Sequence, residues 1–196
     1  MINFDKAFER VVGHEGGFQA HYNDRGNWTT GVIGEGELKG TKFGIASHSY
    51  PNLDIENLTL EQAKKIYLRD FWEPCSKINM DNALVFQMFD AAFHHGIRTA
   101  LRMIQRAVDT KDDGFIGPMS IAAVQAQSLH DTLKRYLAQR IRFMVRLSSF
   151  KTFGGGWMNR IANNLDYAAK DTIENENEPS TVPFNVCYPV SVSKID

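Results

Sequence analysis

The sequence predicts a mainly α-helical protein of the α+β class, with a small glycine-rich β-sheet near the N-terminus. Apolar residues recur at helical spacing over residues 4–15 and again over most of residues 58–172. Between residues 18 and 50 this periodicity is lost and glycines become frequent. A short sheet segregated from a set of helices is the pattern of an α+β fold.

The N-terminal part is expected to form one helix followed by the sheet. Asn3 is a suitable cap for a helix over residues 4–15, whose apolar face carries Phe4, Phe8 and Val11. The runs TTGVI (29–33) and TKFGI (41–45) resemble strands, and the turn-rich GEGELKG lies between them. A cleft between this sheet and the helices would be the natural place for a binding site.

The remainder of the chain predicts six helices and a tail. The first, over residues 58–72, has the capping-box pair Thr59 and Gln62 and is expected to end before Pro74. The second runs from an Asp81 cap to Gly96. The others are expected over residues 98–108, 118–127, 130–148 and 155–172. We therefore expect one domain over residues 1–172, followed by a tail over residues 173–196.

Composition excludes several classes of protein. The 196 residues include 22 basic and 23 acidic side chains, so overall charge favours neither nucleic acid nor an anionic membrane as a partner. Cys75 and Cys187 lack the spacing of a zinc or redox site and are expected to be reduced thiols. Neither a signal peptide nor a transmembrane segment is recognisable. These features predict synthesis in the cytoplasm.

Glu15 occupies an unusual position for a carboxylate. Helical spacing places it on the apolar face with Phe8 and Val11, in the last turn, where the helix dipole disfavours negative charge. Both effects favour the protonated acid that general-acid catalysis requires. Alternatively, Glu15 reaches solvent or pairs with His14 or a later arginine. Asp24 follows in a polar loop, and one apolar and one solvated carboxyl group are the pair that hydrolyses glycosidic bonds.

Several motifs follow one another along the chain. They are HEGGF (14–18), Asp24, TKFGI (41–45), FDAAFHHG (89–96) and the segment 103–124. Their order resembles the N-acetylmuramidases of glycoside hydrolase family 108, which are common among phage and prophage endolysins, and the resemblance spans about residues 4–172. It implies a lysozyme-like fold and cleavage of the β-1,4 bond between N-acetylmuramic acid and N-acetylglucosamine of peptidoglycan. No cofactor is implied, and a holin-type membrane lesion would release the enzyme to the cell wall.

The resemblance also implies roles for individual residues. Glu15 corresponds to the general acid, Asp24 to the base or electrostatic stabiliser, and Thr41 to the residue that orients the attacking water. Related phage-type lysozymes have five residues between the aspartate and the threonine, and by that count Thr30 fits instead. Substrate binding is expected to involve Thr30, Gly44, Asp90 and His94. The chain departs from the family pattern at Phe18, where tyrosine is usual, and in the inserted residues 27–40.

Two segments in the second half permit more than one interpretation. Residues 82–172 resemble a peptidoglycan-binding region, and DDGFIGPMSIAAV (112–124) is similar to part of small wall-binding modules. Alternatively, Phe115 and Pro118 simply hold a turn between two helices. The acidic loop does not fit an EF-hand, because Lys111 and Ser120 stand where calcium ligands are needed. We expect no metal site there.

Histidines and basic residues add two further expectations. His94 and His95 are adjacent and point to different helix faces, so one is expected in the core and the other in the cleft with Asp90. The basic stretch 133–146 is either a solvated helix face or a surface that attracts lipopolysaccharide. The expected protein is a monomeric peptidoglycan hydrolase. The alternative is a non-catalytic peptidoglycan-binding or secretion-accessory protein.

Overall fold

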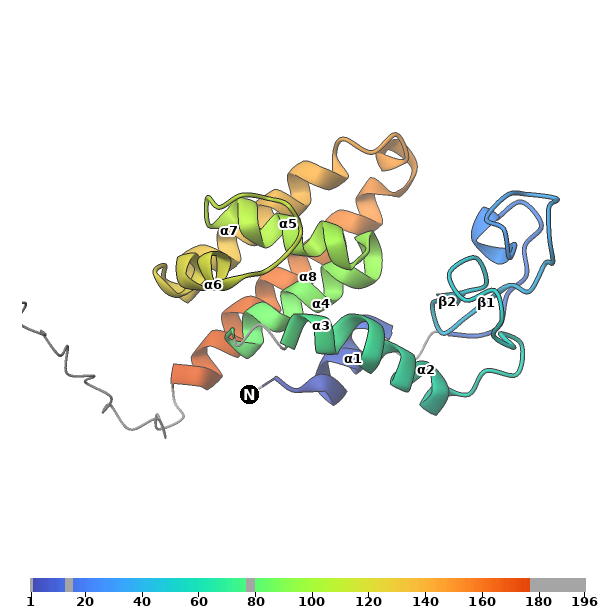
Figure 1. Cartoon of the computed structure of the whole chain (residues 1–196), viewed down its shortest axis with the longest axis horizontal. Helices are drawn as coiled ribbons and strands as arrows, with labels where there is room; N and C mark the ends of the chain where they lie inside the picture. Colours follow the sequence, from blue (N-terminus) through green and yellow to red (C-terminus); the bar gives the residue numbers. More distant parts are fainter. Residues whose placement is uncertain (1, 13–15, 77–79, 177–196) are drawn as a thin grey trace, which may run out of the picture.

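A computed structural model describes residues 2–12, 16–76 and 80–176, which form a helical body and a small lobe (Figure 1). The small lobe holds the 3-10 turn η1 (Arg25–Asn27) and the strands β1 (Thr41–Lys42) and β2 (Ile45–Ala46). The body contains α1 (Phe4–Val12), α2 (Leu60–Tyr67), the π-helical turn η2 (Leu68–Trp72), α3 (Glu73–Ser76), α4 (Asn82–His95), α5 (Ile97–Ala107), α6 (Pro118–Gln125), α7 (Leu129–Met144) and α8 (Phe150–Glu176). The expected mainly helical architecture with a small sheet is confirmed.

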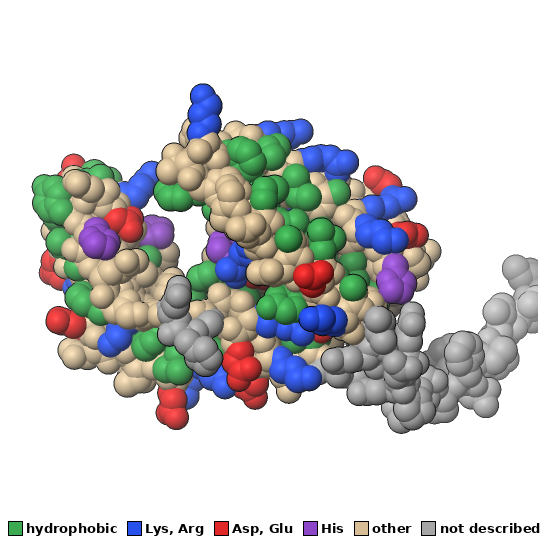
Figure 2. Space-filling view, turned by 180° about the vertical axis from the view of Figure 1, so that it is seen from behind, with side chains coloured by type: hydrophobic (Ala, Val, Ile, Leu, Met, Phe, Trp, Pro, Cys, Tyr) green, Lys and Arg blue, Asp and Glu red, His purple; other side chains and the backbone are tan. Residues whose placement is uncertain are grey.

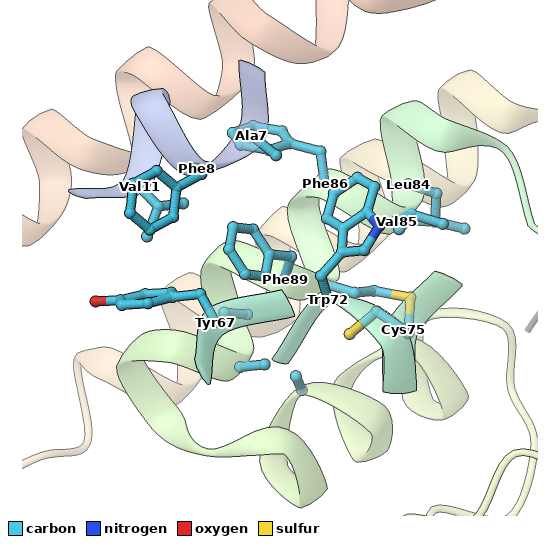
Figure 3. Close-up of a cluster of buried hydrophobic side chains, with 14 of the residues drawn as sticks. Ala7, Phe8, Val11, Tyr67, Trp72, Cys75, Leu84, Val85, Phe86 and Phe89 are labelled. Atoms are coloured by element: carbon cyan, nitrogen blue, oxygen red, sulfur yellow. The ribbon is translucent and has the colours of Figure 1, made fainter. Parts of the chain in front are cut away.

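Helix α4 forms the centre of the body. All ten residues from Ala83 to Ala92 are buried, and α1, α3, α5, α7 and α8 pack around the helix. A helix that is apolar on nearly every side is stable only when other helices pack against it on nearly every side. Figure 3 shows the aromatic part of this core, in which Phe8, Tyr67, Trp72 and Phe89 converge from α1, the α2–η2 segment and α4.

The helix after Thr59 starts as expected but ends later. The Thr59 hydroxyl accepts a hydrogen bond from the Gln62 N–H, and the Gln62 side chain accepts one from the Thr59 N–H, which completes the capping box. Pro74 does not end the helix. In η2 the Glu73 N–H donates to the Leu68 carbonyl five residues back, and this wider turn carries the helical path past the missing N–H of proline into α3.

The later helices follow the expected order. Asp81 caps α4 by accepting a hydrogen bond from the Ala83 N–H at 2.8 Å, and Gly96 ends it with a φ of 81°. Helix α8 starts at Phe150 rather than at 155, and includes glycines 154–156. Glycine is costly inside a helix. Here Trp157 packs on Phe150 and Phe153 across the glycines, with ring centroids 6.1 Å apart in both pairs.

The small lobe contains less sheet than expected. Residues 29–33 form turns, because the Thr29 hydroxyl accepts the Glu37 N–H and the Thr30 hydroxyl donates to the Glu35 carbonyl. These local side-chain bonds replace a strand ladder. The TKFGI segment does form strand: Thr41 pairs with Ala46 and Lys42 with Ile45. Phe43 and Gly44, with φ of 51° and 74°, make the two-residue turn that such a tight hairpin needs.

Candidate active site

A deep hollow separates the small lobe from the helical body, and histidine side chains lie on both sides of it (Figure 2). The β1–β2 turn joins the two parts. Tyr67 of α2 donates a hydrogen bond to the Phe43 carbonyl at 2.8 Å, and its ring packs on Phe93 of α4 at 5.2 Å. A Cβ on Gly44 would lie 2.6 Å from the Tyr67 hydroxyl and 2.8 Å from the Phe93 ring. Because Gly44 has no side chain, the hairpin turn is able to pack directly against Tyr67 and Phe93 of the helical body.

The segment after Glu15 lies along the hairpin. Gln19 and Thr41 exchange two backbone hydrogen bonds of 2.9 and 2.8 Å, and the Phe43 N–H donates to the Gly16 carbonyl at 2.9 Å. A Cβ on Gly16 would be 2.5 Å from the Phe43 ring, so a larger residue does not fit. Glu15 and His14 lie outside the described residues. Gly16, which directly follows Glu15 in the sequence, is thus fixed to the TKFGI turn.

Asp24 and Thr41 are connected through Asn27. Asp24 is exposed and caps η1, with its Oδ1 accepting the Gly26 N–H at 2.8 Å. The Asn27 N–H donates to the Asp24 carbonyl at 3.0 Å, and the Thr41 hydroxyl donates to Asn27 Oδ1 at 2.6 Å. Asn27 is fully buried. Sequence reasoning missed Asn27, because nothing in a polar insertion shows which amide points inward.

The two candidate threonines are engaged differently. The exposed Thr30 hydroxyl donates to the Glu35 carbonyl at 2.7 Å and accepts from the Val32 N–H at 3.2 Å, so it closes its own loop. The half-buried Thr41 hydroxyl donates to Asn27, and among the described residues no group donates a hydrogen bond to it. A hydroxyl with free lone pairs is able to accept a hydrogen bond from a water molecule.

Asp90 does not line the hollow, contrary to expectation. Its carboxylate is 2% exposed and forms ion pairs with Arg140 of α7 and Arg160 of α8, and it accepts a hydrogen bond from Asn164 at 2.8 Å. Burial alone would raise the pKa of this carboxyl group, but the two guanidinium groups hold it well below its usual range. Asp90 is therefore ionised, and its ion pairs and hydrogen bond hold α4 against α7 and α8.

The two histidines beside this cluster are held neutral. The His94 ring rests against Phe93, with centroids 5.0 Å apart, while its outer edge stays exposed. Loss of water on the packed side, together with the charge of Arg160, lowers the pKa of His94 to about 3. Burial and the charge of Arg140 lower the pKa of His95 to about 4. His95 packs on Phe143, and its buried Nε2 makes no hydrogen bond in the described part of the chain.

The loop before α6 is a turn held by hydrogen bonds to one buried side chain. The buried Gln105 side chain donates to Asp113 and to the Phe115 carbonyl, both at 3.0 Å, and accepts from the Gly114 N–H at 2.7 Å. Pro118 occupies the first turn of α6. This agrees with the turn interpretation of DDGFIGP. The residues that the structure describes contain no cluster of three or more potential metal ligands.

The basic residues of α7 divide into two groups. Arg140 is buried against Asp90 and is unavailable to a partner. The exposed Arg142 and Arg146 face Arg106 of α5 across a pocket of about 470 Å³, which Gln139, Phe143 and Leu147 complete. Cys75 is a buried free thiol, and Cys187 lies outside the described residues. None of the described helices is both long and apolar enough to cross a membrane.

Comparisons with known proteins agree with this geometry. Residues 8–96, which run from the second half of α1 through the small lobe to the end of α4, match the glycosyl hydrolase 108 family. The structure of SagA from Brucella abortus is similar, with a TM-score of 0.72 and 26% sequence identity, over 86% of this chain and 95% of that chain. No curated protein sequence matches. Together these findings support a lysozyme-like protein related to glycosyl hydrolase family 108 and, in general, a peptidoglycan hydrolase of the muramidase-like kind.

Proposed function

We propose that this chain is an N-acetylmuramidase, a lysozyme that cleaves the β-1,4 bond between N-acetylmuramic acid and N-acetylglucosamine. Glu15 acts as the general acid, Asp24 as the base or electrostatic stabiliser, and Thr41 orients the attacking water. The reaction needs a proton donor on the leaving oxygen and a carboxylate near the sugar ring. The three residues belong to the matched region 8–96.

One observation carries this proposal: hydrogen bonds tie the surroundings of all three residues together. Asn27 links the backbone of Asp24 to the hydroxyl of Thr41. The next strand-like segment, which begins at Gly16 and therefore directly after Glu15, pairs with Thr41 and Phe43. A purely structural loop does not require this convergence. An active site does, because catalysis depends on fixed relative positions of its groups.

The bonding of the hydroxyl groups favours Thr41 over Thr30 as the third residue. Replacing Thr41 by valine removes the donor to Asn27 and the acceptor for water, so kcat is expected to fall by about tenfold or more. Thr30→Val changes only its own loop and is expected to leave kcat within about threefold. Comparison of kcat for the two variants, with circular dichroism to confirm folding, decides between them. A larger loss for Thr30→Val would reverse the assignment.

The central test compares wild type with Glu15→Gln on purified peptidoglycan. Turbidity measures hydrolysis, and mass spectrometry identifies the reducing ends of the released fragments. Glu9→Gln is the matched control, because Glu9 is an exposed glutamate of α1. We expect folded Glu15→Gln to release no fragments with muramic-acid reducing ends, while Glu9→Gln keeps full activity. If folded Glu15→Gln stays active, or wild type binds the wall without cutting it, the non-catalytic peptidoglycan-binding or secretion-accessory function is supported instead.

We further propose an endolysin role for a monomeric enzyme made in the host cytoplasm and released to the wall by a holin-type lesion. Cysteine usage is consistent with a reducing compartment, since Cys75 is unpaired and buried. Expression in a bacterial host with and without a holin tests this role. Lysis that needs the holin supports it, whereas lysis without a holin contradicts it. Equilibrium sedimentation gives the oligomeric state.

A second proposal concerns the pocket between α5 and α7. Arg142 and Arg146 concentrate positive charge there, next to Arg106, which is ion-paired with Asp112, and Phe143 supplies an apolar wall. Phosphate groups on an apolar anchor, as in lipopolysaccharide, fit this combination. Arg142→Gln with Arg146→Gln is expected to weaken co-sedimentation with lipopolysaccharide micelles and leave peptidoglycan hydrolysis unchanged. Unchanged co-sedimentation would exclude the pocket as the binding surface.

A further inference from the structure

The buried cluster around Asp90 carries more positive than negative charge. Asp90 is the only described carboxylate that pairs with Arg140 and Arg160, and Asn164 is neutral. His94 and His95 stay uncharged at neutral pH. Two guanidinium groups on one carboxylate leave a net charge of about +1 in a region of low dielectric, where unpaired charge is costly. Such an excess is stabilised when an anion binds.

Only one of the two arginines is able to meet an anion. The Arg140 side chain is 1% exposed, whereas that of Arg160 is 27% exposed. Arg160 donates from Nε and Nη2 to the same oxygen of Asp90, at 2.9 and 2.5 Å. In the part of the chain that the structure describes, Nη1 of Arg160 makes no hydrogen bond. A guanidinium held on one edge and open on another is oriented to bind a carboxylate.

Arg160 lies beside the face of α4 that meets the β1–β2 turn. It bonds Asp90, and Phe93 and His94 follow Asp90 on α4 by three and four residues, so they lie on the same face of that helix. The Phe93 ring lies against Gly44 of the β1–β2 turn, and β1, which leads into that turn, carries Thr41. Arg160 is therefore bonded to the same face of α4 whose Phe93 ring meets the hairpin turn.

We propose that Arg160 binds a carboxylate of the glycan substrate and positions it in the hollow, while Asp90 holds Arg160 in place. This inference rests on the proposed function, because peptidoglycan supplies the carboxylates. They come from two sources: the lactyl group of muramic acid, once the stem peptide is removed, and the stem peptide itself. Arg160 is a positioning residue that contributes to KM, and Asp90 acts through Arg160.

The test measures KM and kcat of wild type, Arg160→Gln, Arg160→Lys and Lys170→Gln on three peptidoglycan preparations. These are intact peptidoglycan, glycan strands freed of stem peptides by an amidase, and peptidoglycan with its carboxyl groups chemically amidated. Lys170→Gln is the matched control, because Lys170 is an exposed cation on the same helix. Arg160→Gln leaves Asp90 paired with Arg140 and Asn164, so it is expected to fold, which thermal unfolding checks.

If a stem-peptide carboxylate is bound, wild type is expected to show about a tenfold higher KM on amidated than on intact peptidoglycan, the effect of one charge-assisted hydrogen bond. If the lactyl carboxylate is bound, wild type is expected to show about a tenfold lower KM on the amidase-treated strands than on intact peptidoglycan, and Arg160→Gln removes that difference. Arg160→Gln is expected to show the raised KM on both substrates with nearly unchanged kcat, and Arg160→Lys to lie between. Sensitivity of the amidase-treated strands to Arg160→Gln identifies the lactyl carboxylate, and insensitivity identifies the stem peptide. If Arg160→Gln changes KM on none of the three preparations, or if amidation and Arg160→Gln raise KM independently, the inference is wrong although hydrolysis is real.

Binding separates this inference from the proposed function. Titration of a soluble muramyl disaccharide carrying a free carboxylate, followed by the NMR signal of the Arg160 Nε–H, needs no hydrolysis. If wild type hydrolyses nothing but binds this fragment, and Arg160→Gln does not bind it, the proposed function fails and the Arg160 site stands. If wild type neither hydrolyses peptidoglycan nor binds the fragment, both are overturned.

Discussion

Replacing Gly44 by alanine tests whether the hairpin turn is held by close approach to the helical body. Gly44 has a φ of +74°, and an L-residue in that conformation costs about 1–2 kcal/mol. Its Cβ would also lie 2.6 Å from the Tyr67 hydroxyl and 2.8 Å from the Phe93 ring, and overpacking of this kind costs about 1–3 kcal/mol. We therefore expect Gly44→Ala to lower the free energy of unfolding by about 2–5 kcal/mol.

Urea denaturation followed by circular dichroism measures this loss, with Gly155→Ala as the control. Gly155 lies inside α8, is exposed, and has open space around its Cα. Alanine is the better helix former, so this control is expected to stabilise the protein by about 1 kcal/mol. Substitution by alanine is thus expected to lower the free energy of unfolding at Gly44 and to raise it at Gly155. The reason is that only Gly44 has a left-handed backbone conformation and close neighbouring atoms.

A double-mutant cycle with Tyr67→Phe isolates the clash with the hydroxyl. Tyr67→Phe alone removes the hydrogen bond to the Phe43 carbonyl, a loss of about 1 kcal/mol. In that background Gly44→Ala is expected to cost about 1 kcal/mol less, because one of its close neighbours is gone. If Gly44→Ala changes the free energy of unfolding by less than about 0.5 kcal/mol, or the cycle shows no coupling, the turn is not pinned by Tyr67.

Three further predictions concern buried groups. Burial raises the pKa of the Cys75 thiol to about 12, so in a Cys187→Ser background a thiol reagent is expected to label Cys75 only after unfolding; rapid labelling of the native protein would contradict this. Asp171 is 1% exposed and accepts two hydrogen bonds from Arg10, so Asp171→Asn is expected to cost about 2–4 kcal/mol in chemical denaturation, whereas a cost below about 1 kcal/mol would show a weak pair. The folded pKa of His95 lies below its unfolded value near 6.5, so its contribution to stability is complete above pH 6.5 and is lost as the pH falls towards about 4. The free energy of unfolding of His95→Phe is therefore expected to fall less than that of wild type between pH 6.5 and pH 4, by on the order of 1–2 kcal/mol after allowance for the partial exposure of His95. An identical pH dependence in the variant would refute the assignment.

The sequence predicted the helices well because their signals are local. The Thr59 capping box, the Asp81 cap and the Gly96 end each depend on a few adjacent residues, and each is present. The prediction that Pro74 ends a helix failed, because a π turn restored the path from contacts that no local pattern shows. The early start of α8 was missed for a similar reason. Aromatic packing across its glycines outweighs their poor helix propensity.

The candidate site was predictable in its motifs but not in its connections. Thr41 and Gly44 were recognised from the TKFGI motif, and the structure places both at the hairpin that joins the lobes. Asn27 was missed because its buried side chain is set by a bond to a residue 14 positions away. Asp90 was misplaced because its two cationic partners are 50 and 70 residues distant. Long-range ion pairs leave no periodic signal in a sequence.

The Asp90 cluster connects the architecture of the body to its chemistry. Helix α4 is apolar on almost every side, and apolar packing alone leaves its rotation and height against α7 and α8 weakly specified. One buried carboxylate that must meet Arg140 on α7 and Arg160 on α8 removes that freedom, since any other arrangement leaves a charge unpaired. Fixing the helices in this way also fixes Phe93 and His94, which follow Asp90 on α4 by three and four residues. The charge pairing that organises the core thereby sets the surface on which the Gly44 turn rests.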